Sequence, residues 1–339
     1  MRNSLLATAG TLALTLAQAA DAWAWGATGH FTISRMAALE LPAELPAFLR
    51  TAEMPYILGE LGRELDMSKG QGQTHDFERD PGHYVDFLDD GHTLGGGPLL
   101  SELPISRRDF DTALRAVNQT QYSAGYLPYS IVDGWQQIRA DFAYIRALNA
   151  GEKFARDPAV AARIVRDRQV REMLTIRDIG IWSHYIADAT MPLHVSVHFD
   201  GWGEYPNPKN YFNGRGLHAK FEGAFVRNNI VPSDVGPLVP ALRDLGSDIW
   251  AETRRYIQDD LEQVIPLFEL EAREAFDGPS QAGKDFVARR MALAVAEIRD
   301  LVVMAWRDSA NASIGYPAVT IKDIEAGTVD PTNALFGLD

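Results

Sequence analysis

The sequence predicts an all-α fold that forms a single compact helical domain. Apolar residues recur at spacings of three and four through long stretches of the chain, which is the period of an amphipathic helix. Of the 339 residues, 46% are apolar and 23% are charged, as in ordinary globular proteins. We find no internal repeat, low-complexity tract or linker that would divide the chain, so disorder and coiled-coil arrays are excluded.

Residues 1–24 have the pattern of a secretory signal peptide. A basic Arg2 precedes an apolar run from Leu5 to Ala20, and a small-x-small motif ends at Ala24. The run is too short and too diluted by threonine and glycine to favour a membrane anchor. We therefore expect cleavage after Ala24 and a secreted or periplasmic mature chain that begins at Trp25, has no stable membrane anchor and is a monomer.

Within the rest of the chain, apolar periodicity predicts helices over 142–148, 160–186, 242–267 and 287–306. Glycine and proline mark loops at 69–82, 91–98, 201–216 and 311–317. We expect the domain to span 25–317 and the tail, 318–339, to be irregular.

Charge and cysteine content limit the possible chemistry. The chain has 32 Lys and Arg against 46 Asp and Glu, a net charge of -14, so any affinity for phosphate must come from a local site. The absence of cysteine excludes disulfides, thiolate metal sites and a cysteine nucleophile. Histidine and carboxylate remain as the strong metal ligands.

Two histidine–carboxylate pairs have helical spacing. Asp188 follows His184 by four residues in HYIADATMPLH, and Glu222 follows His218 by four residues in GLHAKFE. Each pair therefore lies on one helical face, where the two side chains can hold one ion. Either pair alone is typical of a cap or surface ion pair, but two pairs together with a third histidine, His194, favour a metal centre.

Two further features extend this set. Pro192 bends or ends the helix, which frees His194 to turn toward a neighbouring ion. Cleavage after Ala24 would leave a free α-amine on Trp25, five residues before His30. Once deprotonated, this amine can chelate zinc together with its own carbonyl oxygen. The alternative is that Trp25 is only a core aromatic residue near a chain end.

The ordered set WGATGH, HYVD, HxxxDxxxxxH and HxxxE resembles the zinc-dependent, single-strand-specific nucleases of the mung bean nuclease type. That family shares a fold superfamily with zinc-dependent phospholipase C, is helical and binds three zinc ions in a cleft. The resemblance spans residues 25–222. It implies three ligand sets: Asp66, His83, His184 and Asp188 for one ion; Trp25 and His30 for a second, bridged by Asp188; and His194, His218 and Glu222 for the third.

The resemblance also implies catalytic and substrate-binding residues. Asp66 would act in catalysis with Lys69, which stands where the family has an arginine beside the scissile phosphate and lacks the bidentate guanidinium fork. Tyr84 would stack on a nucleobase, and Asp86 would accept hydrogen bonds from the base edge. Alternatively, HYVDF is only an alternating segment in which Tyr84 is a packing residue.

The activity implied is hydrolysis of single-stranded DNA and RNA to 5′-phosphate products. Clustered zinc ions can acidify a bound water and neutralise charge on phosphoryl oxygens, which would offset the acidity of the chain. Glu222 stands where the nucleases have aspartate and is typical of phospholipase C, so an enzyme acting on phosphatidylcholine-type lipids is the alternative. The spacings of Trp25 to His30 and of His194 to His218 favour the nuclease. A third class is a non-catalytic zinc-binding protein.

Three histidines match no ligand position of the family. We expect His75, His92 and His198 at loops or rims. The segment 201–216 is longer and richer in aromatic residues than the glycine-rich turn of the family. Its aromatic residues would line an altered pocket: Trp202, Tyr205 and Tyr211.

Overall fold

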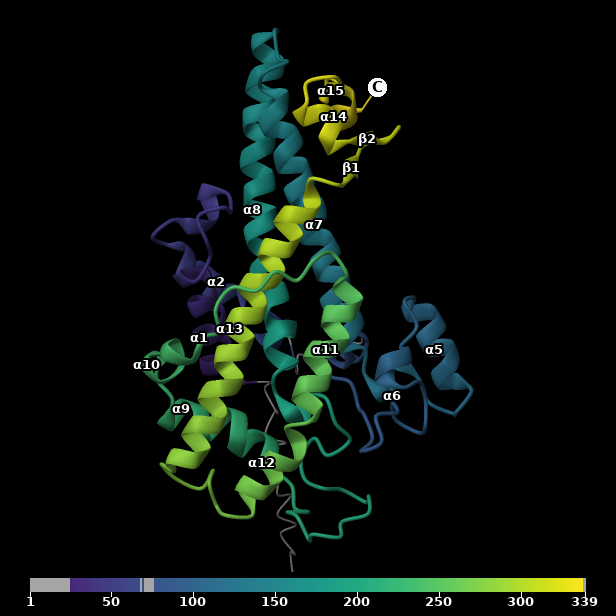
Figure 1. Cartoon of the computed structure of the whole chain (residues 1–339), viewed down its shortest axis with the longest axis vertical. Coiled ribbons are helices and arrows are strands. Elements are labelled where there is room, and N and C mark those ends of the chain that lie inside the picture. Colours follow the sequence, from purple (N-terminus) through teal and green to yellow (C-terminus); the bar gives the residue numbers. More distant parts are fainter. Residues whose placement is uncertain (1–24, 68, 70–75, 338–339) are drawn as a thin grey trace, which may run out of the picture.

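The computed structural model describes residues 25–67, 69 and 76–337. The predicted signal peptide, residues 1–24, and His75 lie outside these residues. The prediction of an all-α fold is confirmed (Figure 1). Within the described residues, no helix combines the length and apolarity needed to cross a membrane.

The α-helices are α1 (Gly26–Leu39), α2 (Met54–Leu61), α3 (Glu64–Met67), α4 (Asp76–Arg79), α5 (Arg107–Arg115), α6 (Gln121–Ala124), α7 (Leu127–Gly151), α8 (Pro158–Asp188), α9 (Val226–Asn229), α10 (Pro232–Val235), α11 (Ile249–Leu261), α12 (Val264–Glu271), α13 (Gln281–Ser309), α14 (Ile321–Glu325) and α15 (Thr332–Phe336). The shorter helical turns are η1 (Ala47–Arg50), η2 (Asp80–His83), η3 (Leu100–Glu102), η4 (Pro192–His194), η5 (Ala219–Phe225) and η6 (Gly236–Leu238). Strands β1 (Ser313–Ile314) and β2 (Val319–Thr320) pair antiparallel.

Three long helices, α7, α8 and α13, form the centre of the molecule. Helices α7 and α8 make a hairpin, α13 packs along both, and α1 and α2 cover α8 (Figure 1). Helix α8 begins where the Asp157 side chain accepts a hydrogen bond from the Ala159 N–H, with Pro158 in the first turn. Helix α13 is buried almost all round, as expected of a central helix.

The long helices predicted at 142–148, 160–186 and 287–306 are confirmed within α7, α8 and α13. The helix predicted over 242–267 begins only at Ile249, because Gly246 adopts a positive φ of 68° and Asp248 caps α11 by accepting from the Ala251 N–H. It also breaks between α11 and α12. In the segment predicted as a loop over 69–82, residues 76–82 form the turns α4 and η2.

The prediction of an irregular tail after residue 317 is wrong. The described part of the tail forms β2, α14 and α15, and β1 lies inside the segment 311–317 that was predicted as a loop. Ile321 and Ile324 are fully buried against Ala143 and Ala147 of α7. Tertiary packing therefore fixes elements that are too short to show a periodic pattern.

Candidate metal centre

Six segments that are distant in the sequence bring eight predicted ligands together. They are His30 on α1, Asp66 on α3, His83 on η2, His184 and Asp188 on α8, His194 on η4, and His218 and Glu222 at η5. Each is buried, with at most 7% of its surface exposed. The most exposed members are His218, His194 and His83, so the cluster faces solvent on that side.

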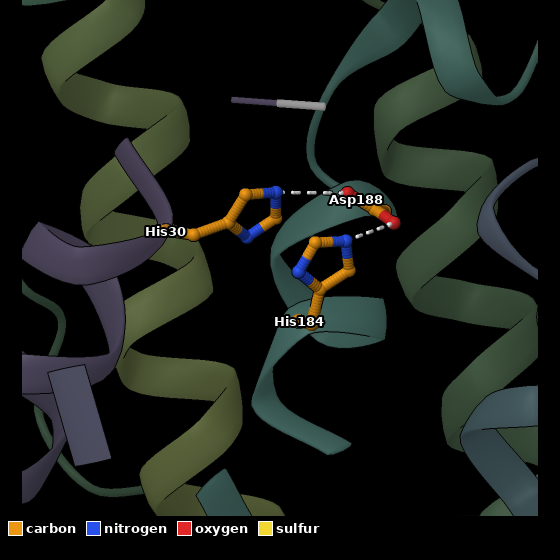
Figure 2. A group of neighbouring side chains, drawn as sticks. All are labelled: His30, His184 and Asp188. Atoms are coloured by element: carbon orange, nitrogen blue, oxygen red, sulfur yellow. Dashed lines mark ion pairs between the residues drawn. The ribbon is translucent and has the colours of Figure 1, made fainter. Parts of the chain in front are cut away.

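Helix α8 supplies the central pair. His184 and Asp188 share one face, with 3.4 Å between His184 Nε2 and Asp188 Oδ2. Asp188 Oδ1 lies 3.3 Å from His30 Nε2, so Asp188 contacts both imidazoles, which stack on each other with 3.7 Å between their centroids (Figure 2). The helix ends at Asp188, and Pro192 starts a separate 3-10 turn that carries His194. This confirms the predicted helix end and the predicted reorientation of His194.

Asp66 and His83 complete this half of the centre. His184 Nε2 lies 3.0 Å from His83 Nδ1 and 3.7 Å from Asp66 Oδ1. His83 Nδ1 is also 3.1 Å from Asp188 Oδ2. Two groups able to hold an ion result, His30 with His184 and Asp188, and Asp66 with His83 and His184. His184 belongs to both groups, whereas the sequence assigned it to one ion.

The third group consists of His194, His218 and Glu222. Glu222 Oε2 lies 3.0 Å from His218 Nε2 and 3.8 Å from His194 Nε2. Before η5, Asp200 Oδ1 accepts from the backbone N–H of Gly216 and of His218, which fixes the start of the turn. Segment η5 is a π-helical turn, a form that often occurs at functional sites.

Backbone carbonyls orient three of the imidazoles. The Nδ1 atoms of His184, His194 and His218 lie 2.7 to 2.8 Å from the carbonyl oxygens of Gly62, His83 and Phe199, respectively. Because a carbonyl only accepts, each Nδ1 carries the proton and, in the neutral ring, each Nε2 presents a lone pair to the centre. The Nε2 atoms of His194 and His218 are only 3.1 Å apart. Two lone pairs at that distance repel unless a proton or a cation lies between them.

The electrostatics also fit a bound cation. Burial raises the pKa of Asp188 to about 7 and that of Glu222 to about 7, because ionisation in this interior is costly. Burial lowers the pKa of His184 to about 4, so this imidazole is neutral at physiological pH. Burial would lower the pKa of His218 as well, but the neighbouring Glu222 raises it above its usual value. Imidazole nitrogens and carboxylate oxygens are donors that zinc sites use. Eight of the nine predicted ligands thus form a set whose chemistry suits zinc.

Trp25, the ninth predicted ligand, lies at the start of α1. Its indole is fully buried, packs against Phe221 and donates a 2.7 Å hydrogen bond to the carbonyl of Ala187, next to Asp188. A Cβ added to Gly26 would lie 3.5 Å from the Glu222 carbonyl oxygen, so the start of α1 lies beside both halves of the centre. The burial also fits the alternative that Trp25 is a core aromatic residue. Coordination by its amine stays a prediction.

The predicted catalytic pair is in contact. Lys69 Nζ lies 2.9 Å from Asp66 Oδ1. Burial would raise the pKa of Asp66, but His184, Lys69 and His30 together hold that pKa below its usual value. Asp66 is therefore ionised at neutral pH, with a cation next to it.

Tyr84 and Asp86 follow His83 in an extended segment at the edge of the centre. Tyr84 is half-buried, its hydroxyl donates to the carbonyl of Tyr122, and burial and then Asp86 raise its pKa. Burial raises the pKa of Asp86 to about 8. The two predicted substrate-binding residues thus share one poorly solvated environment, and their roles stay predictions.

His92 and His198 both lie in loops, as predicted. His92 is partly exposed and pairs with Asp90. His198 is fully buried instead of lying at a rim: its Nδ1 lies 2.7 Å from the Trp202 carbonyl oxygen and its Nε2 lies 3.0 Å from Asp89 Oδ1. Its ring also stacks on Trp202 at 3.9 Å between centroids. His198 therefore holds the base of the segment 201–216.

The aromatic residues of this segment form a packed cluster. Trp202 and Tyr211 are buried around Phe268, and both line a pocket of about 630 Å³ that includes no predicted zinc ligand. Tyr205 packs on His198 and is not part of the pocket lining. A pocket beside the segment is confirmed for two of the three residues, but it lies next to the metal centre and not in it.

Sequence reasoning missed the residues that orient the ligands. Gly62 and Phe199 act through carbonyl oxygens, which no side-chain pattern reveals. Asp200 acts through a turn with Gly216 and His218, and Tyr185 packs its ring on His83 at 5.5 Å. Among these residues, only Tyr185 could have been proposed from the sequence, because it directly follows the predicted ligand His184.

Comparisons with known proteins add no functional information. No protein-family model matches the chain, and neither a curated protein nor a solved structure is significantly similar to it. The function must therefore be argued from the site.

Proposed function

We propose that this protein is a zinc-dependent phosphodiesterase that cleaves single-stranded DNA and RNA. The observation that carries the proposal is that three groups of histidines and carboxylates meet in one buried centre. Within each group the ligand atoms lie within 4.8 Å of one another. His30, Asp66, His83, His184, Asp188, His194, His218 and Glu222 would hold the ions, with the Trp25 amine as the ninth ligand. When bound, clustered zinc ions neutralise the charge of a phosphodiester and lower the pKa of water.

The chain's own residues would position the substrate phosphate. Lys69 presents an ammonium group at the edge of the centre, with 18% of its side chain exposed. It can contact a phosphoryl oxygen while it remains paired with Asp66. The ionised Asp66 carboxylate can accept a hydrogen bond from the attacking water and orient it toward phosphorus.

Tyr84 and Asp86 would bind the nucleobase. A stacked tyrosine tolerates every base but needs an unpaired one, which favours single strands. At neutral pH Asp86 carries a proton in the free protein, because its pKa is about 8. It can therefore both donate to and accept from a base edge.

The direct test gives the purified protein that starts at Trp25 single-stranded DNA, RNA and phosphatidylcholine in parallel, with and without a chelator. We expect cleavage of both nucleic acids and its loss on chelation. Turnover of phosphatidylcholine as the main activity would instead favour the phospholipase C that Glu222 suggests. Metal binding without any product would point to a zinc-binding protein.

Substitution of Tyr84 separates stacking from metal binding. Tyr84→Ala should slow cleavage of single strands about tenfold, since stacking contributes roughly 1–3 kcal/mol per base. Tyr84→Phe should restore the rate, and zinc content should stay unchanged in both variants. Tyr56→Ala, at an exposed tyrosine on α2, is the matched control. Unchanged cleavage by Tyr84→Ala would remove Tyr84 from the substrate site.

A further inference from the structure

The tip of the α7–α8 hairpin differs in charge from the rest of the chain. Helices α7 and α8 extend beyond the other long helices at the top of Figure 1, where α14 and α15 accompany them. Residues 152–178 contain seven Arg and Lys against five Asp and Glu, a net charge of +2. Because the whole chain has a charge of -14, the remaining residues carry -16. The tip is therefore a cationic region of an acidic protein.

One face of α8 within this tip combines arginines with exposed apolar side chains. We define the α8 stripe by residues at mutual spacings of three, four and seven, which share a helical face: Arg163, Arg166, Val170, Met173, Leu174 and Arg177. All six are exposed; Met173 keeps 62% of its surface accessible and Val170 keeps 50%. Ala162 and Gln169 on the same face are exposed and uncharged. One carboxylate, Asp167, borders the stripe, four residues after Arg163 and three before Val170.

The arginines of the stripe are little neutralised by the chain. Within the part of the chain that the structure describes, no ion pair involves Arg166. Arg177 contacts only the neighbouring Asp178, at 2.8 Å, and Arg163 reaches Asp167 only at 3.9 Å while it packs over the ring of Phe336. These guanidinium groups are therefore available to an anionic partner.

A recess beside the stripe adds apolar contact area. It has a volume of about 290 Å³ and lies between α7, α8 and α15. Val170 and Leu174 of the stripe line it, and the rest of the lining is apolar or aromatic except for one acidic and one basic residue: Tyr144, Leu148, Asp167, Arg171, Leu335 and Phe336. The exposed apolar side chains thus border a hollow and do not stand singly on a flat surface.

We propose that the α8 stripe binds the surface of a membrane containing anionic phospholipids. Arginines that alternate with aliphatic residues match a bilayer interface, where the guanidinium groups meet phosphates and the apolar side chains enter the region below them. The stripe has three arginines and a single bordering carboxylate, Asp167, so a second copy of the chain would bring mostly arginine against arginine. A nucleic acid offers no aliphatic surface, and the stripe has no aromatic side chain on which a base could stack.

The experiment measures sedimentation of the zinc-loaded protein with vesicles of phosphatidylcholine, with and without phosphatidylglycerol. We expect binding only to vesicles that contain phosphatidylglycerol, and weakening by salt because exposed charges are screened. The double variant Arg166→Glu/Arg177→Glu should bind at least about tenfold more weakly. The matched control is Arg108→Glu/Arg289→Glu, at two exposed arginines on α5 and α13, which should bind like the wild type.

A second variant tests the apolar half of the stripe without changing charge. Val170→Gln/Met173→Gln keeps helix-forming side chains at exposed positions and should also weaken binding. Equal binding to both vesicle types, or undiminished binding by both stripe variants, would overturn the proposal. Loss of single-stranded DNA binding by the charge-reversal variant, with vesicle binding retained, would assign the stripe to nucleic acid and also overturn it. Hydrolysis at the metal centre is a separate readout, so failure of either proposal is distinguishable from failure of the other.

Discussion

Two clusters in this protein contain buried carboxylates, and the charge of these carboxylates is balanced in different ways. The first is the metal centre, and the second is a network of two arginines with three carboxylates that joins α11, α13 and the segment before α11. In this network Glu297 Oε2 accepts from Arg243 at 2.5 Å and from Arg255 at 3.2 Å. Arg243 also donates to Glu252 at 3.0 Å and to Asp300 at 3.2 Å. The chain itself supplies the cations.

The metal centre lacks comparable cations. Lys69 pairs with Asp66. Asp188 and Glu222 instead lie next to the Nε2 atoms of His184 and His218. Backbone carbonyls bind the Nδ1 atoms of these two rings, so that in the neutral ring Nε2 carries the lone pair. A buried, ionised carboxylate without a neighbouring cation destabilises the folded state. Arginines supply that cation at Glu297 but not at Asp188 and Glu222. This difference is the reason why we propose that bound metal ions supply the positive charge of the centre.

The largest effect should come from blocking the predicted N-terminal ligand. An amide nitrogen has no available lone pair, so a protein that keeps a residue before Trp25 should fold but lose the ion shared by Trp25, His30 and Asp188. We expect about two zinc ions per chain and a phosphodiesterase rate lower by roughly a hundredfold. Zinc analysis and rate measurement against the protein that starts at Trp25 check this. Equal zinc and equal rates would show that the amine is not a ligand.

A smaller effect should follow from removing a cation of the second cluster. Arg243→Gln removes a positive charge that balances the carboxylates of Glu297, Glu252 and Asp300. Because Arg243 is partly exposed, we expect the free energy of unfolding to fall by only about 2 kcal/mol. Zinc content should stay at the wild-type value, because this network needs no ion. Urea unfolding and metal analysis test both statements. Loss of zinc would contradict the separation of the two clusters.

Asp86 is a third case, a carboxyl group whose pKa is raised by burial. We expect its substitution to have the smallest effect of the three. Burial raises its pKa in the folded protein to about 8, above the ordinary value of 3.8 for an aspartate. Between these values the folded state holds more protons than the unfolded state, so the contribution of Asp86 to stability falls as pH rises. Asp86→Asn removes this dependence.

The stability of Asp86→Asn relative to wild type should therefore improve from about pH 5 to about pH 9. Urea unfolding of zinc-loaded protein at both values measures the change. Asp90→Asn, at an exposed carboxylate, is the control and should show no such improvement. A constant difference between Asp86→Asn and wild type would show that Asp86 is ionised throughout.

The sequence predicted the ligands better than it predicted their grouping. The pairs His184 with Asp188 and His218 with Glu222 follow from helical spacing, and both are in contact in the structure. The meeting of His184 Nε2 with His83 depends on how η2 packs against α8, which no local pattern encodes. Carbonyls that select a tautomer are equally invisible in a sequence.

The fold shows the same limit. Long amphipathic helices were predictable because each contains many turns of one periodic pattern. The tail helices α14 and α15 span five residues each, and tertiary contacts with α7 and α8 decide their conformation. The burial of His198 was unpredictable for a related reason: it lies in a loop, as predicted, but it packs on Trp202 and contacts Asp89, which are distant from one another in the sequence.

Metal analysis of the protein that starts at Trp25 tests the central claim most directly. We predict about three zinc ions per chain, one for each group of ligands. Asp188→Asn should remove more zinc than His218→Ala, because Asp188 lies within 3.4 Å of His30, His83 and His184 whereas His218 belongs to one group. One zinc ion or fewer in the wild-type protein, or equal losses in the two variants, would contradict the account of the centre.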